Sequence, residues 1–257
     1  CGVEAIDCET GEKLTIRAKL VIDAAATGHA RLQERTQSLE QSRSGCWLKA
    51  TNLVLSRALC GDYAVGLSGA QDTLTGEISA SPESRYFFFV PYSSHTLFGT
   101  FYFALEELPE TLSVTENEIN LMLAQAQQLC PDANLTRSDV SMSHVGVVPA
   151  NGDSGGPVPA IEKKASIRPG SQTNSNEGLI VVQGVKYTES FELAKQVVTL
   201  VGTMLGRRHL PSPQGRLPTD HADAALPIPQ LARKAMRDEM AIHLTDFGLR
   251  RATIGEL

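Results

Sequence analysis

The chain has 257 residues, of which 42% are hydrophobic and 20% charged, and this is the composition of a globular protein. Its 23 basic and 29 acidic residues give a net charge of -6, which excludes the basic surface typical of nucleic-acid-binding proteins. No apolar run approaches the roughly 20 residues that cross a bilayer. The five cysteines form no CxxC pair, which favours reduced thiols in a cytoplasmic protein over a disulfide framework or a zinc site.

The first part of the chain predicts a hairpin followed by a short strand. Residues 2–7 and 13–18 alternate apolar and polar side chains around a turn at residues 9–12. Residues 20–22 are apolar and predict a buried strand, which runs into Ala24, Ala25 and Ala26. Small side chains at the end of a strand let a ligand or another backbone approach closely.

The middle of the chain predicts an antiparallel sheet with one helix. Residues 47–103 form short runs rich in β-branched and aromatic residues, separated by Gly, Pro and Ser. The run RYFFFVPY at 85–92 places aromatic side chains on both faces of a strand, so we expect both faces to be covered, as plain core or as the wall of a flavin site. A capping box at 115–118 predicts a helix to about Cys130, followed by a strand at 139–148 and a long loop at 150–177.

The second half predicts a buried strand at 178–182, a turn at Gly184, and a helix from about Ser190 to Arg207. Free N–H groups of the turn and the helix dipole favour an anion there, and Lys186 adds a positive charge. The alternative is an ordinary β-turn-α corner with a solvated lysine. An apolar stripe is expected on this helix, formed by Phe191, Ala194, Val198 and Val201. We expect a linker at 209–227 and a last helix at 229–251.

Residues 152–157 read GDSGGP, the nucleophile motif of chymotrypsin-like serine proteases. His29, Asp62 and Ser154 follow one another in the order that this family uses. However, no cysteine precedes the motif, paired cysteines are lacking, and about a hundred residues follow Ser154 where the family has a short tail. A chance match is therefore favoured, and a serine hydrolase is kept as an alternative.

Several segments, taken in order, resemble the FAD-dependent glycerol-3-phosphate dehydrogenases, which belong to the group that includes D-amino-acid oxidase. The segments are KLVIDAAATGHARL, KATNLVLSRAL, YFFFVPY with TLFGT, TENEINLML, HVGVVPA, GLIVVQGVKYT and RDEMAIHLTDFGLRRA. They span nearly the whole chain at plausible spacing. Their common order carries the resemblance, since none of them is decisive alone.

The resemblance implies an α/β fold that is α+β in part. Residues 1–45 and 178–208 would form a partial Rossmann-like FAD-binding domain, and 46–177 an antiparallel-sheet substrate domain. Residues 209–257 would form a linker and the start of a C-terminal helical region. The family's GxGxxG finger, which cradles the FAD pyrophosphate, does not occur in this sequence. We therefore expect a truncated N-terminus and a fragment that is inactive by itself.

The resemblance also implies site residues. The cofactor contacts would be Ala24, Ala25, Ala26, Gly184, Val185, Lys186, Tyr187 and Thr188. Ala26 stands where the family has glycine, Val148 where it has a substrate-binding arginine, and Asn52 where it has an active-site histidine. The implied catalytic candidates are Lys186, Asn52 and His144, although a histidine such as His144 is more often a core or surface residue.

The implied chemistry is the oxidation of a secondary alcohol, such as glycerol 3-phosphate or a related polyol, by hydride transfer to FAD. A quinone is the expected electron acceptor, which would bring a cytoplasmic protein to the surface of the inner membrane. The substitutions at Ala26, Val148 and Glu189 leave a non-catalytic relative as a further alternative.

Overall fold

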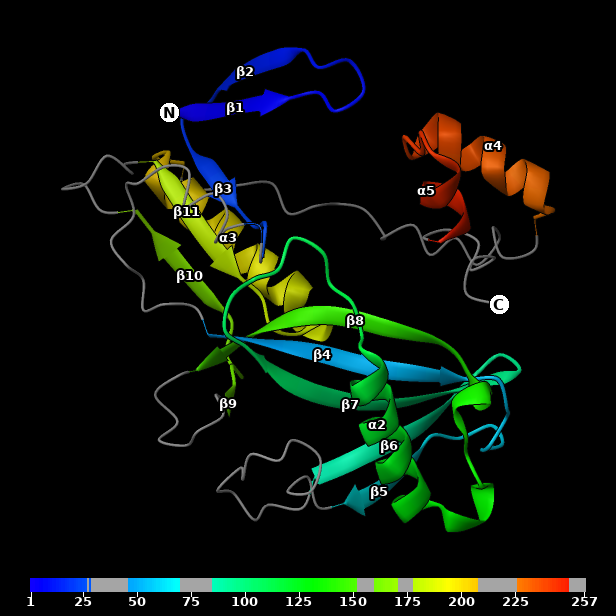
Figure 1. The fold of residues 1–257 in the computed structure, drawn as a ribbon. Coiled ribbons are helices and arrows are strands. Elements are labelled where there is room, and N and C mark those ends of the chain that lie inside the picture. The colour runs from blue at the N-terminus through cyan, green and yellow to red at the C-terminus, as the bar shows by residue number, and fades with distance from the viewer. Residues whose placement is uncertain are drawn as a thin grey trace. The chain divides into compact units, whose positions relative to one another are not determined.

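The computed structural model describes residues 1–26, 28, 46–69, 85–151, 160–170, 178–207 and 226–249 (Figure 1). The chain divides into two compact units, Cys1–Arg208 and His209–Leu257. In the described part of the first unit the strands form sheets of two, three and six strands. Antiparallel pairing dominates, and one pair is parallel, which agrees with the predicted mixture of α/β and α+β features.

The two-stranded sheet is the predicted hairpin. Strands β1 (Gly2–Ile6) and β2 (Lys13–Arg17) pair antiparallel, with Gly2 opposite Arg17. The Asp7 carboxylate accepts the backbone N–H groups of Thr10 and Glu9, which lower the pKa of Asp7, and Gly11 turns the chain at a φ of 74°. Hydrogen bonds within the loop thus stabilise the turn.

The six-stranded sheet confirms the predicted antiparallel sheet. Its strand order is β5-β6-β7-β4-β8-β9, and every neighbouring pair is antiparallel. The strands are β4 (Cys46–Leu55), β5 (Val65–Gly69), β6 (Arg85–Tyr92), β7 (His95–Leu105), β8 (Val140–Asn151) and β9 (Ala160–Ile161).

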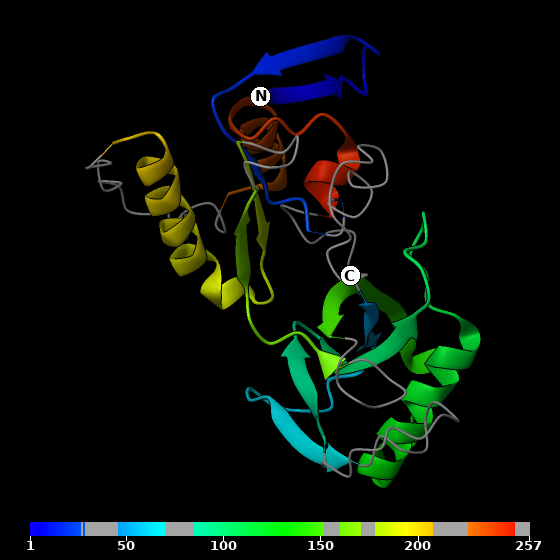
Figure 2. The same ribbon diagram turned by 90° about the vertical axis from the view of Figure 1, so that its left-hand side faces the viewer.

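Helix α2 (Glu116–Leu129) lies along one face of this sheet (Figure 2). The predicted capping box begins it: the Thr115 hydroxyl accepts the Glu118 N–H, and the Glu118 carboxylate accepts the Thr115 N–H at 2.8 Å. Each large apolar side chain buried between α2 and the sheet contributes about 1.5–3 kcal/mol. These include Leu53, Leu55, Phe87, Phe89, Phe98, Phe101, Ile119, Met122 and Leu123.

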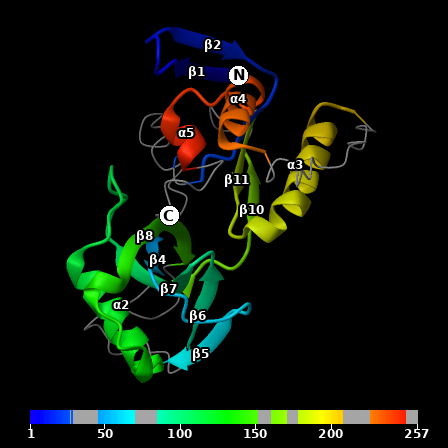
Figure 3. The same cartoon turned by 90° about the vertical axis from the view of Figure 1, so that its right-hand side faces the viewer.

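Strand β6 is less covered on the face away from α2. Phe87 and Phe89 are 0% and 4% exposed. Phe88, which lies between them, is 47% exposed, and Tyr86, which precedes Phe87, is 61% exposed. The expectation that both faces of this strand are covered was therefore wrong for the described residues. The physical reason is that α2 covers one face only (Figure 3). Alternate side chains along β6 therefore point away from the core.

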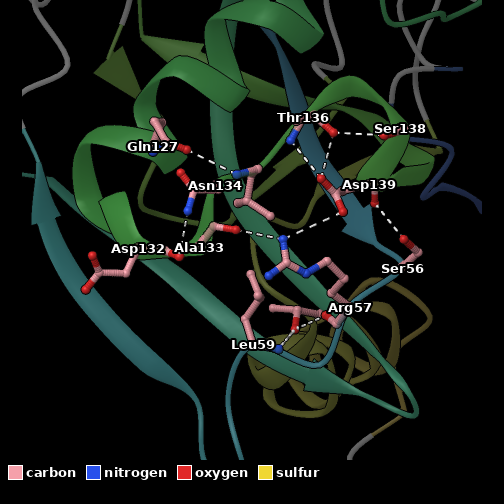
Figure 4. A network of polar contacts seen from close by, with 12 residues as sticks. Ser56, Arg57, Leu59, Gln127, Asp132, Ala133, Asn134, Thr136, Ser138 and Asp139 are labelled. Carbon is pink, nitrogen blue, oxygen red and sulfur yellow. Dashed lines mark hydrogen bonds and ion pairs between the residues drawn. The ribbon is translucent and has the colours of Figure 1, made fainter.

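A network of polar contacts fixes where β8 begins (Figure 4). Arg57 donates to the Ala133 carbonyl at 2.7 Å and pairs with Asp139. Asp139 in turn accepts the N–H and hydroxyl of Thr136, and these hydrogen bonds and Arg57 lower the pKa of Asp139. The Ser56 N–H donates to the Asp139 carbonyl. The 3-10 turns η1 (Pro131–Ala133) and η2 (Arg137–Asp139) are thereby tied to the end of β4, which sets the β4–β8 register.

The three-stranded sheet has the order β10-β11-β3. Strand β11 (Leu179–Gln183) pairs antiparallel with β10 (Ser166–Pro169) and parallel with β3 (Val21–Asp23). The prediction of a loop through 150–177 was wrong at β9 and β10, because such short strands are specified by their pairing partners. The strand at 20–22 is less buried than expected: it is an edge strand, and Ile22 is 47% exposed.

The turn η3 (Tyr187–Glu189) and helix α3 (Ser190–Met204) follow β11. The helix itself was predicted, but its apolar stripe was not placed correctly. Val197 and Gly202 are buried, whereas Phe191 and Val198 are 55% and 49% exposed. Apolar residues occur on more than one side of this helix, so periodicity alone could not select the packed side.

The second unit contains helices α4 (Ile228–Asp238) and α5 (Leu244–Gly248) rather than the single helix predicted at 229–251. Met240 adopts a φ of 55°, which an α-helix does not allow, and a capping box of His243 and Asp246 begins the second helix. A small apolar cluster holds the unit together: Leu231, Ala232, Ala235, Ala241 and Phe247.

Candidate functional site

The small-residue corner, defined as residues 24–26 and 184–188, is the first place where predicted site residues meet. The parallel pairing of β3 and β11 sets Val181 beside Asp23, so both segments leave the sheet at the same edge. Ligands of open α/β sheets bind at the carboxyl ends of parallel strands. Sequence reasoning proposed the two segments separately, and the strand pairing brings them together.

The corner has room for a ligand. Ala24, Ala25, Ala26, Gly184 and Thr188 are exposed. A Cβ at Gly184 would meet only Leu193, at 3.6 Å, which is ordinary van der Waals contact. Nothing in the described chain therefore requires glycine at 184, and the bare backbone there suits the close approach of a flat group such as a flavin ring.

Ala26 adds a second indication at the corner. Its φ is 52°, the left-handed region that glycine adopts without strain and alanine rarely adopts. Glycine is the residue expected at this position from the family resemblance. The backbone thus keeps a glycine conformation although the residue has changed.

Lys186 is not a free cation at this corner. Its ammonium lies 3.0 Å from the Glu189 carboxylate, and its side chain is 56% exposed. Tyr187 is 98% exposed, and Val185 is half-buried. The positive charge of Lys186 is therefore largely balanced within the turn that carries it.

The second place is the distal face, defined as the side of the six-stranded sheet away from α2. Cross-strand pairs between β4 and β8 lie on it, and Asn52 stands opposite His144. The other pairs on this face are Leu48 with Val148, Ala50 with Gly146, and Val54 with Met142. The strands thus bring two predicted catalytic residues, Asn52 and His144, onto one face with Val148.

Hydrogen bonding orients the Asn52 amide. Its Oδ1 accepts the Thr100 hydroxyl at 2.8 Å, and a Cβ at Gly99 would collide with the same oxygen. The His144 and Tyr92 rings pack edge-on, with 6.1 Å between their centroids. The buried Nε2 of His144 has no hydrogen-bond partner among the described residues. Sequence reasoning missed Gly99, Thr100 and Tyr92; a glycine inside the strand TLFGT was the available signal of a close approach.

Three comparisons with known proteins bear on this geometry. No protein-family profile matches the chain. It is 26% identical over 147 residues to the glycerol-3-phosphate dehydrogenase of Synechocystis sp., covering 57% of this chain and 26% of that protein. It is 25% identical over 207 residues to the aerobic glycerol-3-phosphate dehydrogenase of Staphylococcus aureus, covering 79% of this chain and 34% of that protein.

A solved structure agrees with these matches. The glycerol-3-phosphate dehydrogenase from Bacillus halodurans, complexed with FAD, superposes with a TM-score of 0.62 and 25% identity, covering 82% of this chain and 37% of that chain. The chain is related to the glycerol-3-phosphate dehydrogenases. It spans between a quarter and about two fifths of the length of these dehydrogenases.

The GDSGGP motif at 152–157 belongs to the alternative hypothesis of a serine hydrolase. Ser154 and His29, two members of the alternative serine hydrolase set, lie outside the described residues, and Asp62 is exposed. Within the described ranges, no group of His, Cys, Asp and Glu could hold a metal ion. No helix in those ranges is long and apolar enough to cross a membrane.

Proposed function

We propose that this protein is a glycerol-3-phosphate dehydrogenase-like oxidoreductase that binds FAD and oxidises a secondary alcohol. The observation that carries the proposal is the small-residue corner, where Ala24–Ala26 and Gly184 leave one edge of a parallel strand pair. The FAD complex of the Bacillus halodurans dehydrogenase, which is similar over 82% of this chain, supports it.

In this proposal the corner holds the flavin through its backbone. The exposed turn at residues 184–188 and the N-terminal end of α3 are suited to the polar edge of a flavin or to its phosphates. Lys186 and Glu189 would act as a pair, with the lysine oriented by the carboxylate. Bound flavin would supply the two-electron acceptor that no amino-acid side chain offers.

The distal face would hold the alcohol. Bound flavin would supply the acceptor for the hydride of the alcohol carbon, and a base on the chain would take the hydroxyl proton, so that a carbonyl compound would form. His144, which lies opposite Asn52, is the candidate for this base, because a neutral imidazole nitrogen can accept a proton. The Asn52 amide, held by Thr100, is suited to donate to the substrate oxygen.

A reduced flavin would need a second electron acceptor, and for this protein we propose a quinone at a membrane surface. The family resemblance motivates this step. It is tested by the reduction of a soluble quinone analogue by the alcohol-reduced protein.

The experiment that tests the proposal is flavin loading of the protein as its gene encodes it. The purified protein should be yellow and carry FAD, and Gly184→Leu should lose FAD because the larger side chain occupies the corner. Gly61→Leu is the matched control, since nothing lies within 4 Å of a Cβ at Gly61. A folded, colourless wild type that takes up no FAD would falsify the proposal.

A further inference from the structure

A bulge in β7 holds the Asn52 side chain from one side. The register of β4 with β7 shifts between Thr51 and Leu53, so that Asn52 alone stands opposite two residues of β7, Gly99 and Thr100. The Thr100 hydroxyl donates to the Asn52 Oδ1 at 2.8 Å, and a Cβ at Gly99 would collide with that oxygen. Because a bulge re-aims the side chains around it, this one sets where the Asn52 amide lies.

The hydrogen bond from Thr100 also decides which end of the amide faces a ligand. The oxygen of a carboxamide only accepts hydrogen bonds, and its nitrogen only donates them. Since the Asn52 oxygen accepts from Thr100, the two N–H donors lie at the other end of the amide group. A side chain without this partner could present either end after a half-turn of the amide. The contact with Thr100 therefore leaves Asn52 as a donor toward a ligand oxygen.

The His144 imidazole is held by a second aromatic ring. The Tyr92 and His144 rings lie 6.1 Å apart between centroids and are inclined by 87°, an arrangement that aromatic pairs favour. Tyr92 ends β6 and His144 lies in β8, and β7 and β4 stand between these strands in the sheet. Side chains rather than strand pairing therefore make this contact, and it restricts the rotation of the imidazole.

We propose that Thr100 and Tyr92 are positioning residues of the distal face. Thr100 holds Asn52 with its N–H donors toward the substrate oxygen, and Tyr92 holds the His144 imidazole where it takes the hydroxyl proton. This inference rests on the proposed function, since it assigns residues to the same site. Neither residue touches the substrate, and each acts through its partner. All four side chains are half-buried, so the sheet holds them without sealing them in its core.

The test for Thr100 is a double-mutant cycle on the FAD-loaded protein. Thr100→Val loses the hydroxyl at nearly the same volume, and Thr100→Ser keeps it. With glycerol 3-phosphate as the reductant in anaerobic rapid mixing, Thr100→Val should slow flavin reduction about fivefold, the value of one hydrogen bond, while Thr100→Ser retains most of the rate. In an Asn52→Ala background, Thr100→Val should have no further effect. An equal loss in both backgrounds, or no loss in either, overturns the role of Thr100.

The test for Tyr92 has the same form. Tyr92→Leu removes the ring, and Tyr92→Phe retains it. Tyr92→Leu should slow flavin reduction about fivefold, the value of an aromatic pair, and Tyr92→Phe should retain most of the rate. In a His144→Gln background, Tyr92→Leu should add nothing. A loss that persists without His144, or a Tyr92→Phe rate as low as that of Tyr92→Leu, overturns the role of Tyr92.

Magnetic resonance spectra of the same variants separate this inference from the proposed function. Ring currents of Tyr92 act on the His144 ring protons, so in histidine-labelled protein Tyr92→Leu should move the signals that His144→Gln removes, and Tyr92→Phe should leave them nearly in place. In asparagine-labelled protein, Thr100→Val should move the Asn52 side-chain amide signals more than Thr100→Ser does. If no alcohol reduces the flavin, the proposed function fails, and the spectra still decide whether the two residues hold their partners. Signals that do not move in Tyr92→Leu and Thr100→Val overturn the inference.

Discussion

The small-residue corner and the distal face differ in what they offer a ligand. The corner offers backbone and space: Gly184 and Ala24–Ala26 carry almost no side chain, and its one charged side chain is paired. The distal face offers side-chain atoms, Asn52 and His144, placed by the pairing of two long strands. A site built from backbone should be sensitive to added atoms. A site built from side chains should be sensitive to atoms removed.

The largest effect is expected when the proposed base of the distal face is removed. His144→Gln keeps a hydrogen-bonding group but cannot take a proton, so the rate of flavin reduction by the preferred alcohol should fall about a hundredfold or more. FAD affinity should stay unchanged, because His144 is proposed to touch the alcohol. Rapid-mixing absorbance measures the first quantity and fluorescence titration the second.

His95→Gln is the control for this prediction, since His95 lies at the β6–β7 turn and hydrogen-bonds to Ser94. Equal rates for His144→Gln and the wild type would remove His144 from the proposed chemistry.

The next largest effect tests how closely the side chains pack around Asn52. In Gly99→Ala the new Cβ would collide with the Asn52 oxygen and approach the Thr51 carbonyl to 3.2 Å. Overpacking of this kind costs about 1–3 kcal/mol in the free energy of unfolding. Gly146→Ala on the same sheet is the control, because nothing lies within 4 Å of its Cβ. Urea denaturation of both variants should separate them; equal stability would mean that Asn52 simply moves aside.

The opposite face of the same sheet gives a pH-dependent effect. Burial disfavours the charged form of Glu118, but hydrogen bonds from Lys49 and Thr115 and the charge of Lys49 outweigh it, so its pKa is lowered. A lowered pKa stabilises the fold at neutral pH, and this contribution is lost as the pH falls through the folded pKa, below the ordinary glutamate value of about 4.3.

Lys49→Met should therefore destabilise the protein by about 1–2 kcal/mol at neutral pH, because Glu118 loses its partner. The difference between variant and wild type in the free energy of unfolding should become smaller in acid, because Glu118 becomes protonated. Denaturation at a series of pH values measures this difference. Arg137→Met, which breaks the exposed pair with Glu116, is the control and should destabilise the protein much less, because water screens that pair. A gap that is independent of pH would show that Lys49 acts through packing alone.

The elements of the fold differ in how well the sequence predicts them. The β1–β2 hairpin, the antiparallel sheet and the start of α2 were predicted because their signals are local: turn residues, alternation and the Thr115–Glu118 capping box. Strands β9 and β10 were missed because their few residues become strands only by pairing with β8 and β11. Local pattern also could not foresee the left-handed Met240 that divides the last helix.

The same distinction holds for the candidate site. Small residues before and after a strand were visible in the sequence, and a parallel pair of strands suffices to bring them to one edge. His144 lies opposite Asn52 only through the register of two strands about ninety residues apart, which shifts at a bulge between Val54 and Leu55, next to the Arg57–Asp139 network. The roles of these residues in binding and catalysis stay predictions.

The smallest expected effect sharpens the account of the corner. Ala26 holds a φ of 52°, where a Cβ is strained, so Ala26→Gly should stabilise the protein by about 0.5–1 kcal/mol, reduced by the greater freedom of glycine in the unfolded chain. Ala24→Gly, two residues earlier and without a positive φ, should instead be neutral or destabilising. Thermal denaturation distinguishes the two, and FAD affinity measured beside it shows whether the Ala26 methyl group also limits the approach of the flavin. A loss of stability in Ala26→Gly as large as in Ala24→Gly would mean that residue 26 does not hold the left-handed conformation in solution.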